Sequence, residues 1–189
     1  GFAWASDRAF EAHRGAGLRT PYWDWTARLD PAAHYKRYCG TPPVGHLYGL
    51  RAALDMIVEE GLEAIWARHA AFARAVRAAV AAWSSPGGIE FNILDPEARS
   101  DAVTTILTGG IDAERLRRMA EDRAGLTLGI GLGAWQGAAF RIGHMGHLDP
   151  PHLLGTVATV EAVLVAMEAP MGGSGVAAAA AALAPELAG

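Results

Sequence analysis

The chain has 189 residues, of which 51% are hydrophobic and 19% charged, a composition typical of a globular protein that excludes a disordered one. The net charge of −4 is spread along the sequence, so we expect neither nucleic acid nor an anionic membrane as a partner. The single cysteine excludes an internal disulfide and no apolar run reaches the roughly 18 residues of a membrane span, which together favour a cytoplasmic protein.

The first residues, GFAWA, are apolar and carry no initiator methionine or signal-peptide pattern. They are typical of a buried strand, so we expect a strand at residues 2–5 and a natural chain that extends upstream of residue 1. Ser6 or Asp7 can cap a helix that continues to Ala12. The segment YKRYCGTPP, residues 35–43, is expected to be a loop, because its glycine and its proline pair disfavour both helix and strand.

Residues 46–83 carry apolar side chains at three- and four-residue steps, which predicts one long helix or two helices that meet at Gly61. The segment SSPGG, residues 84–88, ends this pattern. Beyond it, IEFNIL and AVTTIL are typical of strands, and Asp112 can cap a helix that ends near Arg123. LTLGIG and AAFRIGHM then predict two further strands, and the last long helix begins near His152 and ends before Pro170.

This order of elements, β, β, α, β, β, α, predicts an α+β sandwich with its helices on one face of the sheet. The alanine-rich end, VAAAAAALAPELAG, favours helix by propensity but offers little packing volume. We therefore expect a terminal helix or a frayed tail there.

Arg141 lies between Phe140 and Ile142 in the apolar segment AAFRIGHMG. A permanent cation brought toward a core needs a counter-charge, so we expect either a buried acid or an anionic ligand beside it. Tyr38 and Thr41 belong to a loop whose hydroxyl groups and backbone amides suit an anion such as a phosphate group. A plain proline turn with Tyr38 packed on a neighbour is the equal alternative.

Other polar residues give weaker signals. Three histidines lie near Asp149, namely His144, His147 and His152, but strand alternation separates them and no zinc spacing occurs, so no metal site is expected. Lys36 is the only lysine and lies in a charged loop, which favours a solvated lysine over a catalytic one. Cys39 is interpreted as a small packed hydrophobe rather than a nucleophile. The run GIGLG precedes a strand instead of a helix and so fails as a dinucleotide fingerprint.

Three segments together resemble the C-terminal part of class V aminotransferases, and within them the alanine–glyoxylate and serine–glyoxylate aminotransferase family: TPPVGHLYGLRAALDMIVEEGLEAIWARH, GLTLGIGLG and FRIGHMG. The resemblance covers essentially the whole chain. It implies pyridoxal 5'-phosphate as cofactor, a homodimer, and the C-terminal portion of the α/β fold type I. The implied parts are the end of the large cofactor-binding domain with an interface loop (1–45), connecting helices (46–83), a small α+β domain (84–170) and an alanine-rich tail (171–189).

The same resemblance implies roles for single residues. Arg141 would bind the substrate carboxylate, which answers the question of its counter-charge; a structural ion pair with an acid such as Asp149 is the alternative. Tyr38 and Thr41 would reach the cofactor phosphate of the partner subunit. The glycines near 129–133 would lie at the mouth of the active site.

The lysine that forms the Schiff base in this family would precede residue 1, and Lys36 does not match its motif. The resemblance therefore implies ping-pong transfer of an amino group between a small amino acid, alanine or serine, and glyoxylate, by an enzyme of which this chain alone would be inactive. Two alternatives stay open. The first is another pair such as pyridoxamine and pyruvate, and the second is a non-catalytic α+β interaction domain.

Overall fold

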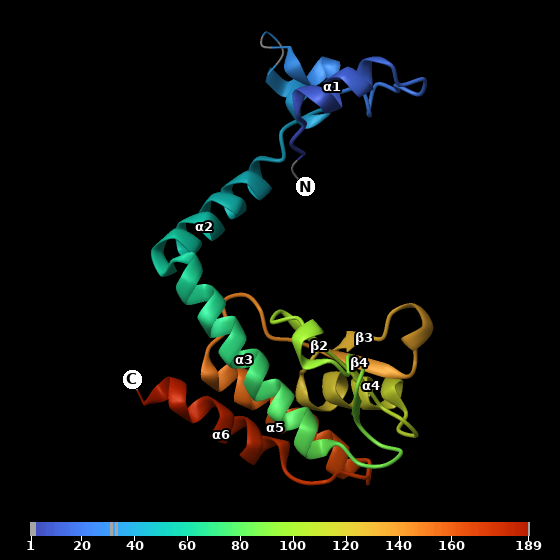
Figure 1. The fold of residues 1–189 in the computed structure, drawn as a ribbon, viewed down its shortest axis with the longest axis vertical. Helices are drawn as coiled ribbons and strands as arrows, with labels where there is room; N and C mark the ends of the chain where they lie inside the picture. Colours follow the sequence, from blue (N-terminus) through green and yellow to red (C-terminus); the bar gives the residue numbers. More distant parts are fainter. Residues whose placement is uncertain (1–2, 31, 33, 189) are drawn as a thin grey trace. The chain divides into compact units, whose positions relative to one another are not determined.

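The structure is a computed structural model in which residues 3–30, 32 and 34–188 are described (Figure 1). The chain divides into two compact units, Gly1–Glu59 and Glu60–Gly189. The first unit is mostly exposed, whereas the second holds the hydrophobic core.

The first unit begins with helix α1 (Asp7–Arg14), whose N-terminus is capped by the hydroxyl group of Ser6, as predicted. The strand expected at residues 2–5 is wrong for residues 3–5, which form no strand, and residue 2 lies outside the described part. Two short 3₁₀ helices follow, η1 (Thr26–Leu29) and η2 (His34–Tyr38). The predicted loop at 35–43 thus begins with a 3₁₀ turn, which the glycine and prolines after it then end.

The apolar pattern of residues 46–83 corresponds to two helices in the structure. Helix α2 (Val44–Glu60) ends where Gly61 adopts a φ of 87°, and helix α3 (Leu62–Trp83) begins directly after it. The second of the two sequence alternatives is therefore confirmed. Helix α3 buries its C-terminal half, with Phe72, Val76 and Trp83 in the core of the second unit.

A four-stranded antiparallel sheet forms one layer of the second unit. Its strands are β1 (Glu90–Phe91), β2 (Val103–Leu107), β3 (Gly129–Ile130) and β4 (Ala139–Gly143), in the order β1-β2-β4-β3. Two 3₁₀ turns lie between strands, η3 (Pro96–Ala98) and η4 (Gly133–Trp135). Helices α4 (Ala113–Ala124) and α5 (Pro150–Ala166) complete the predicted β, β, α, β, β, α order, which confirms the α+β fold.

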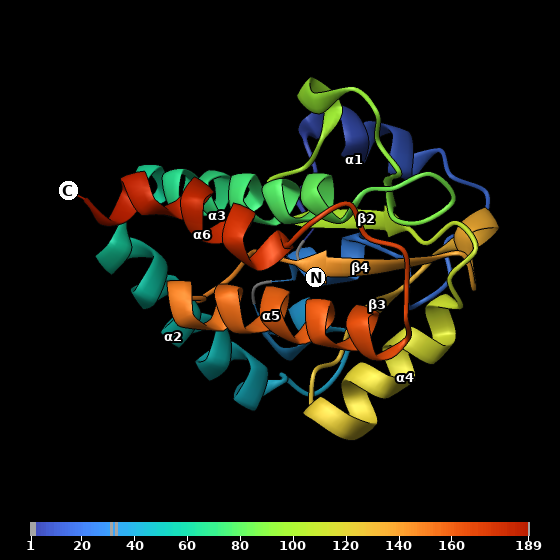
Figure 2. The ribbon, with the colours of Figure 1, turned by 90° about the horizontal axis from the view of Figure 1, so that it is seen from below.

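Helices α3, α4 and α5 of the second unit lie on one face of this sheet, and α6 packs on α3 and α5 (Figure 2). Side chains alternate along each strand, so Ile106, Phe140 and Ile142 point into the core beneath the helices. Arg141 and its cross-strand partner Thr105 point to the opposite face. The arginine is therefore not drawn toward the core, and the premise that it needs a buried counter-charge there is wrong.

The alanine-rich end forms helix α6 (Gly175–Leu187), which packs on α3 and α5 and buries Ala179 and Leu183. Its small side chains allow close approach to α3. Gly175 lies so close to Trp83 that an added Cβ would come within 2.4 Å of the indole ring. Of the two sequence alternatives, the terminal helix is the one observed, and it belongs to the core of the second unit.

Candidate functional site

Arg141 lies in the middle of β4, on the sheet face opposite the helices, and is half-buried. Thr105 of β2 is its partner on one flank and Gly129 of β3 is its partner on the other. The Nε atom of Arg141 donates a hydrogen bond of 2.7 Å to the carbonyl oxygen of Ile130. Among the residues that the structure describes, none accepts a hydrogen bond from the two terminal nitrogens of this guanidinium.

The expected alternative for Arg141, an ion pair with Asp149, is not formed. Asp149 instead caps helix α5, and its carboxylate accepts hydrogen bonds from the backbone N–H of His152 at 2.9 Å and from the Nδ1 atom of that residue at 2.6 Å. These two bonds, the backbone one first, lower the pKa of Asp149 below its ordinary range. The acid is thus engaged at the start of a helix, and Arg141 keeps its charge available for a ligand.

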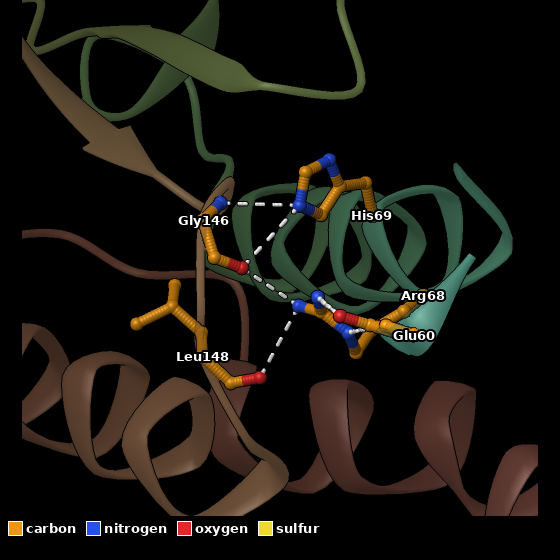
Figure 3. A network of polar contacts seen from close by, with 5 residues as sticks. All are labelled: Glu60, Arg68, His69, Gly146 and Leu148. Carbon is orange, nitrogen blue, oxygen red and sulfur yellow. Dashed lines mark hydrogen bonds and ion pairs between the residues drawn. The ribbon is translucent and has the colours of Figure 1, made fainter. Parts of the chain in front are cut away.

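The loop after β4 is tied to the N-terminal part of helix α3 by a network of polar contacts (Figure 3). The Nη1 atom of Arg68 donates to the carbonyl oxygens of Gly146 and Leu148, at 2.7 and 3.3 Å. The backbone N–H of Gly146 donates to the Nε2 atom of His69 at 3.1 Å. Figure 3 shows both side chains reaching from α3 toward the same turn of this loop.

Glu60 completes this network by holding Arg68 with two hydrogen bonds, from Nε at 2.6 Å and from Nη2 at 2.8 Å. The bonds from Arg68 lower the pKa of Glu60, and the same pair raises the pKa of Arg68. The arginine side chain is therefore fixed at one end by a carboxylate and at the other by two backbone carbonyls. The result is a braced loop directly after the strand that carries Arg141.

His144 is buried within the same loop and has a structural role. Its Nδ1 atom lies 3.0 Å from the carbonyl oxygen of Asp101, which can only accept, so Nδ1 carries the proton. The Nε2 atom then accepts from the hydroxyl group of Thr104 at 3.0 Å. Burial is the main cause that lowers the pKa of His144, so the ring is neutral at pH 7.

The three histidines of this region do not converge. His144 is buried, His152 pairs with Asp149 at the start of α5, and His147 is exposed on the loop. In the described part of the chain no three histidine, cysteine, aspartate or glutamate side chains are grouped so that they could hold a metal ion. None of the helices described there combines the length and apolar character that a membrane crossing requires.

In the first unit, Tyr38 and Thr41 flank a tight turn after η2. Cys39 and Gly40 both have positive φ values, 61° and 148°, so the chain reverses sharply between the two hydroxyl groups. Cys39 is exposed at this turn, and its interpretation as a packed hydrophobe was wrong, because the left-handed turn directs the residue outward. Tyr38 and Thr41 are also exposed, and the turn offers hydroxyl groups and backbone amides suited to an anion.

Arg28 holds this loop from within the first unit. Its guanidinium donates to three carbonyl oxygens, those of Lys36 at 3.0 Å, Tyr22 at 2.7 Å and Pro21 at 3.3 Å. Tyr38 and Arg28 also line a hollow of about 920 Å³ whose walls are mostly apolar and include the aromatic side chains of Trp4, Tyr22, Trp23 and Trp25. Arg28 therefore orders the backbone that leads to Tyr38.

Lys36 donates from Nζ to Asp30 at 3.1 Å, and both side chains are partly exposed. A catalytic lysine is generally activated by apolar surroundings or by a neighbouring cation, and a carboxylate partner provides neither. The position of Lys36 supports a surface ion pair.

The family model described as aminotransferase class-V matches residues 24–136, more than half of the sequence. The chain belongs to the class-V aminotransferase family. The resemblance seen in the sequence motifs is thereby confirmed.

Individual class-V relatives cover nearly the whole chain. Serine–glyoxylate aminotransferase of Arabidopsis thaliana is 41% identical over 181 residues, which is 95% of this chain and 44% of that protein. L-aspartate–glyoxylate aminotransferase of Paracoccus denitrificans is 40% identical over 92% of this chain and 43% of its own length. The crystal structure of pyridoxamine–pyruvate aminotransferase from Mesorhizobium loti superposes with a TM-score of 0.79 at 30% identity, over 96% of this chain and 46% of that one. The chain thus spans less than half the length of these relatives.

The candidate site residues are divided between the two units of the chain. Arg141 lies in the second unit, and Tyr38 and Thr41 lie in the first. Sequence reasoning singled out these three but missed the brace formed by Glu60, Arg68 and His69. The only local signal was the adjacent polar pair Arg68 and His69 in a helix that also carries Glu63, Arg74 and Arg77, and this pair does not distinguish a brace from an ordinary solvated face.

Proposed function

We propose that this chain supplies the substrate-carboxylate site of an aminotransferase that uses pyridoxal 5'-phosphate. The observation that carries the proposal is the arrangement of Arg141, whose Nε atom is held by Ile130 while its two terminal nitrogens have no described acceptor. Two parallel N–H groups of a guanidinium match the two oxygens of a carboxylate. Because amino acids and keto acids both carry a carboxylate, one arginine can serve both substrates.

The turn at residues 38–41 is proposed to contact the phosphate of the cofactor held by a partner subunit, within a homodimer. The hydroxyl groups of Tyr38 and Thr41 and the amides of a turn with two positive φ values fit a phosphate group. When bound, the cofactor supplies the electron sink that allows an amino group to move between two carbon skeletons. The chain's own contribution here is binding and orientation.

The catalytic lysine is proposed to lie outside these 189 residues. Lys36 is the only lysine of the sequence, and its ion pair with Asp30 does not suit the role. The chain on its own is therefore expected to be inactive, and the cytoplasmic location stays a prediction. A direct test is to add pyridoxal phosphate to the full-length protein that carries this chain, reduce with borohydride and map the modified lysine by peptide mass.

The expected adduct lies on a lysine outside this sequence, and a Lys36→Arg variant should give the same adduct in the same yield. A stoichiometric adduct on Lys36 that disappears in Lys36→Arg would show that the catalytic lysine had been misplaced and that this chain carries its own chemistry.

The proposed substrates are a small amino acid, serine or alanine, and glyoxylate. Support comes from relatives at about 40% identity whose names include glyoxylate. Pyridoxamine with pyruvate is the second candidate, favoured by the superposition with a TM-score of 0.79. Arg141 recognises only the carboxylate that glyoxylate and pyruvate share, so it does not separate the two.

Transamination assays with the full-length protein separate these candidates. Serine, alanine and aspartate are offered with glyoxylate, and pyridoxamine is offered with pyruvate. We expect the highest kcat/KM with serine or alanine and glyoxylate. Turnover of pyridoxamine and pyruvate alone would select the second candidate, and absence of all transamination would favour the non-catalytic interaction domain.

A further inference from the structure

Strand β3 is the edge strand next to β4, and its backbone geometry directs one carbonyl group outward. Gly129 pairs with Arg141, and Ile130 pairs with Phe140. The backbone N–H of Gly131 donates to Ala139 at 3.1 Å. Because backbone groups alternate in direction along an antiparallel strand, the carbonyl group of Ile130 points away from β4, toward the free edge of the sheet.

Arg141 reaches this carbonyl oxygen by crossing over Gly129. A Cβ atom added at Gly129 would lie 3.1 Å from the Cβ atom of Arg141 and 3.2 Å from its Nε atom. Both distances are shorter than ordinary carbon contacts, so the path of the arginine side chain uses the space that any other residue would fill. On the other flank of Arg141 stands Thr105, which has a side chain of its own.

The contact with Ile130 decides which part of the guanidinium is left for a ligand. Nε is engaged by the carbonyl oxygen at 2.7 Å, which fixes the plane of the group and leaves the edge formed by the two terminal nitrogens. A long side chain that is fixed before binding loses less rotamer freedom when the ligand arrives. The edge strand thus preorganises the arginine.

We propose that Gly129 and the carbonyl group of Ile130 are positioning elements for substrate recognition, which seat Arg141 so that its terminal nitrogens meet the substrate carboxylate. This inference rests on the proposed function. Gly129 acts by having no side chain, and Ile130 acts through its backbone, so neither needs to touch the substrate.

The test is Gly129→Ala in the full-length enzyme, with Gly155→Ala as the matched control. Gly155 lies exposed in α5 with nothing within 4 Å of an added Cβ. Because displacing a binding group by about 1 Å can cost up to about a hundredfold, we expect Gly129→Ala to raise KM for carboxylate substrates about tenfold. The kcat at saturation should change less than about twofold, and Gly155→Ala should change neither, because the reacting groups lie elsewhere.

A second arm separates positioning from general damage to the sheet. In an Arg141→Lys background, Gly129→Ala should change KM by less than about twofold, because lysine has no Nε–H group to be displaced from Ile130. A tenfold effect that persists in this background would overturn the inference.

A third measurement needs no change at Gly129 and so does not depend on how that variant folds. In the wild-type chain, the Arg141 Nε–H signal, assigned by its loss in Arg141→Lys, should exchange with solvent about tenfold more slowly than that of the exposed Arg118. Equal exchange rates for the Nε–H groups of Arg141 and Arg118 would overturn the inference that the carbonyl group of Ile130 holds Arg141 in place.

The outcomes also distinguish this inference from the function on which it rests. If Arg141→Ala raises KM while Gly129→Ala does not, the inference fails and the proposed function stands. If Arg141→Ala leaves KM unchanged, the proposed function itself fails.

Discussion

Replacing Glu161 with alanine should loosen the C-terminal helix from the core. The carboxylate of Glu161 accepts hydrogen bonds from the indole Nε1 of Trp83 at 2.8 Å, from the hydroxyl group of Ser174 at 2.8 Å and from the backbone N–H of Val176 at 2.9 Å. Burial alone would raise the pKa of Glu161, but these bonds together lower it below its ordinary value. One side chain therefore joins α3, α5 and the start of α6.

The expected loss of stability follows from the groups that would be left without a partner. Trp83 is fully buried, and a buried donor without an acceptor costs about 1–3 kcal/mol. The amide of Val176 belongs to the first turn of α6, where the loss of a side-chain acceptor costs about 1 kcal/mol. Ser174 is exposed and can turn to water. Glu161→Ala should therefore lower the free energy of unfolding by about 2–4 kcal/mol.

The assay is urea unfolding of this chain followed by circular dichroism, together with amide hydrogen exchange of residues 175–187. Asp122→Ala is the control, because Asp122 is exposed on α4 and should stay within about 0.5 kcal/mol of the wild type. An unchanged unfolding midpoint and unchanged exchange in α6 for Glu161→Ala would refute the reasoning.

Three further predictions concern the core and the loop. Gly175→Ala should destabilise the chain by about 1–3 kcal/mol in thermal unfolding, because its Cβ would come within 2.4 Å of Trp83, whereas Gly155→Ala should not. Arg68→Ala should speed amide exchange of residues 144–149 about tenfold by releasing the carbonyl groups of Gly146 and Leu148, and Arg118→Ala should leave that exchange unchanged. The pKa of His144 is lowered from 6.5 by burial, so the unfolded chain binds the proton more readily and stability should fall as the pH drops below about 6.5. His144→Gln should remove that part of the pH dependence of unfolding, and an unchanged slope would contradict the assignment.

Much of the fold was predictable because a helix leaves a pattern of apolar spacing and capping residues within a short stretch of sequence. The three- and four-residue spacing predicted the helical stretch that forms α2 and α3, with a break at Gly61 as one of two alternatives, and Asp112 was identified correctly as the cap of α4. The strands were predicted longer than they are: of IEFNIL only Glu90 and Phe91 pair with β2. Strand ends depend on which neighbour is present, and that is a property of the folded chain.

The candidate site was predicted less completely. Arg141 was singled out by the family resemblance and by an expected position toward the core. The second reason was wrong, since strand alternation turns Arg141 away from the core between Phe140 and Ile142. The brace from Arg68 to Gly146 joins residues that are 78 positions apart, and no local pattern encodes such a contact. The roles of Tyr38 and Thr41 at the cofactor stay a prediction.

The most direct test of the central claim compares two amino donors in the full-length enzyme and in its Arg141→Ala variant. One donor is serine and the other is 2-aminoethanol, which has the same amino and hydroxyl groups but no carboxylate. Two hydrogen bonds to a charged group correspond to about 3 kcal/mol, so the variant should lose on the order of a hundredfold in kcat/KM with serine. With 2-aminoethanol the variant and the wild type should agree within about twofold, because the interaction that is removed is absent. An equal loss with both donors, or no loss with serine, would contradict the assignment of Arg141 as the group that binds the substrate carboxylate.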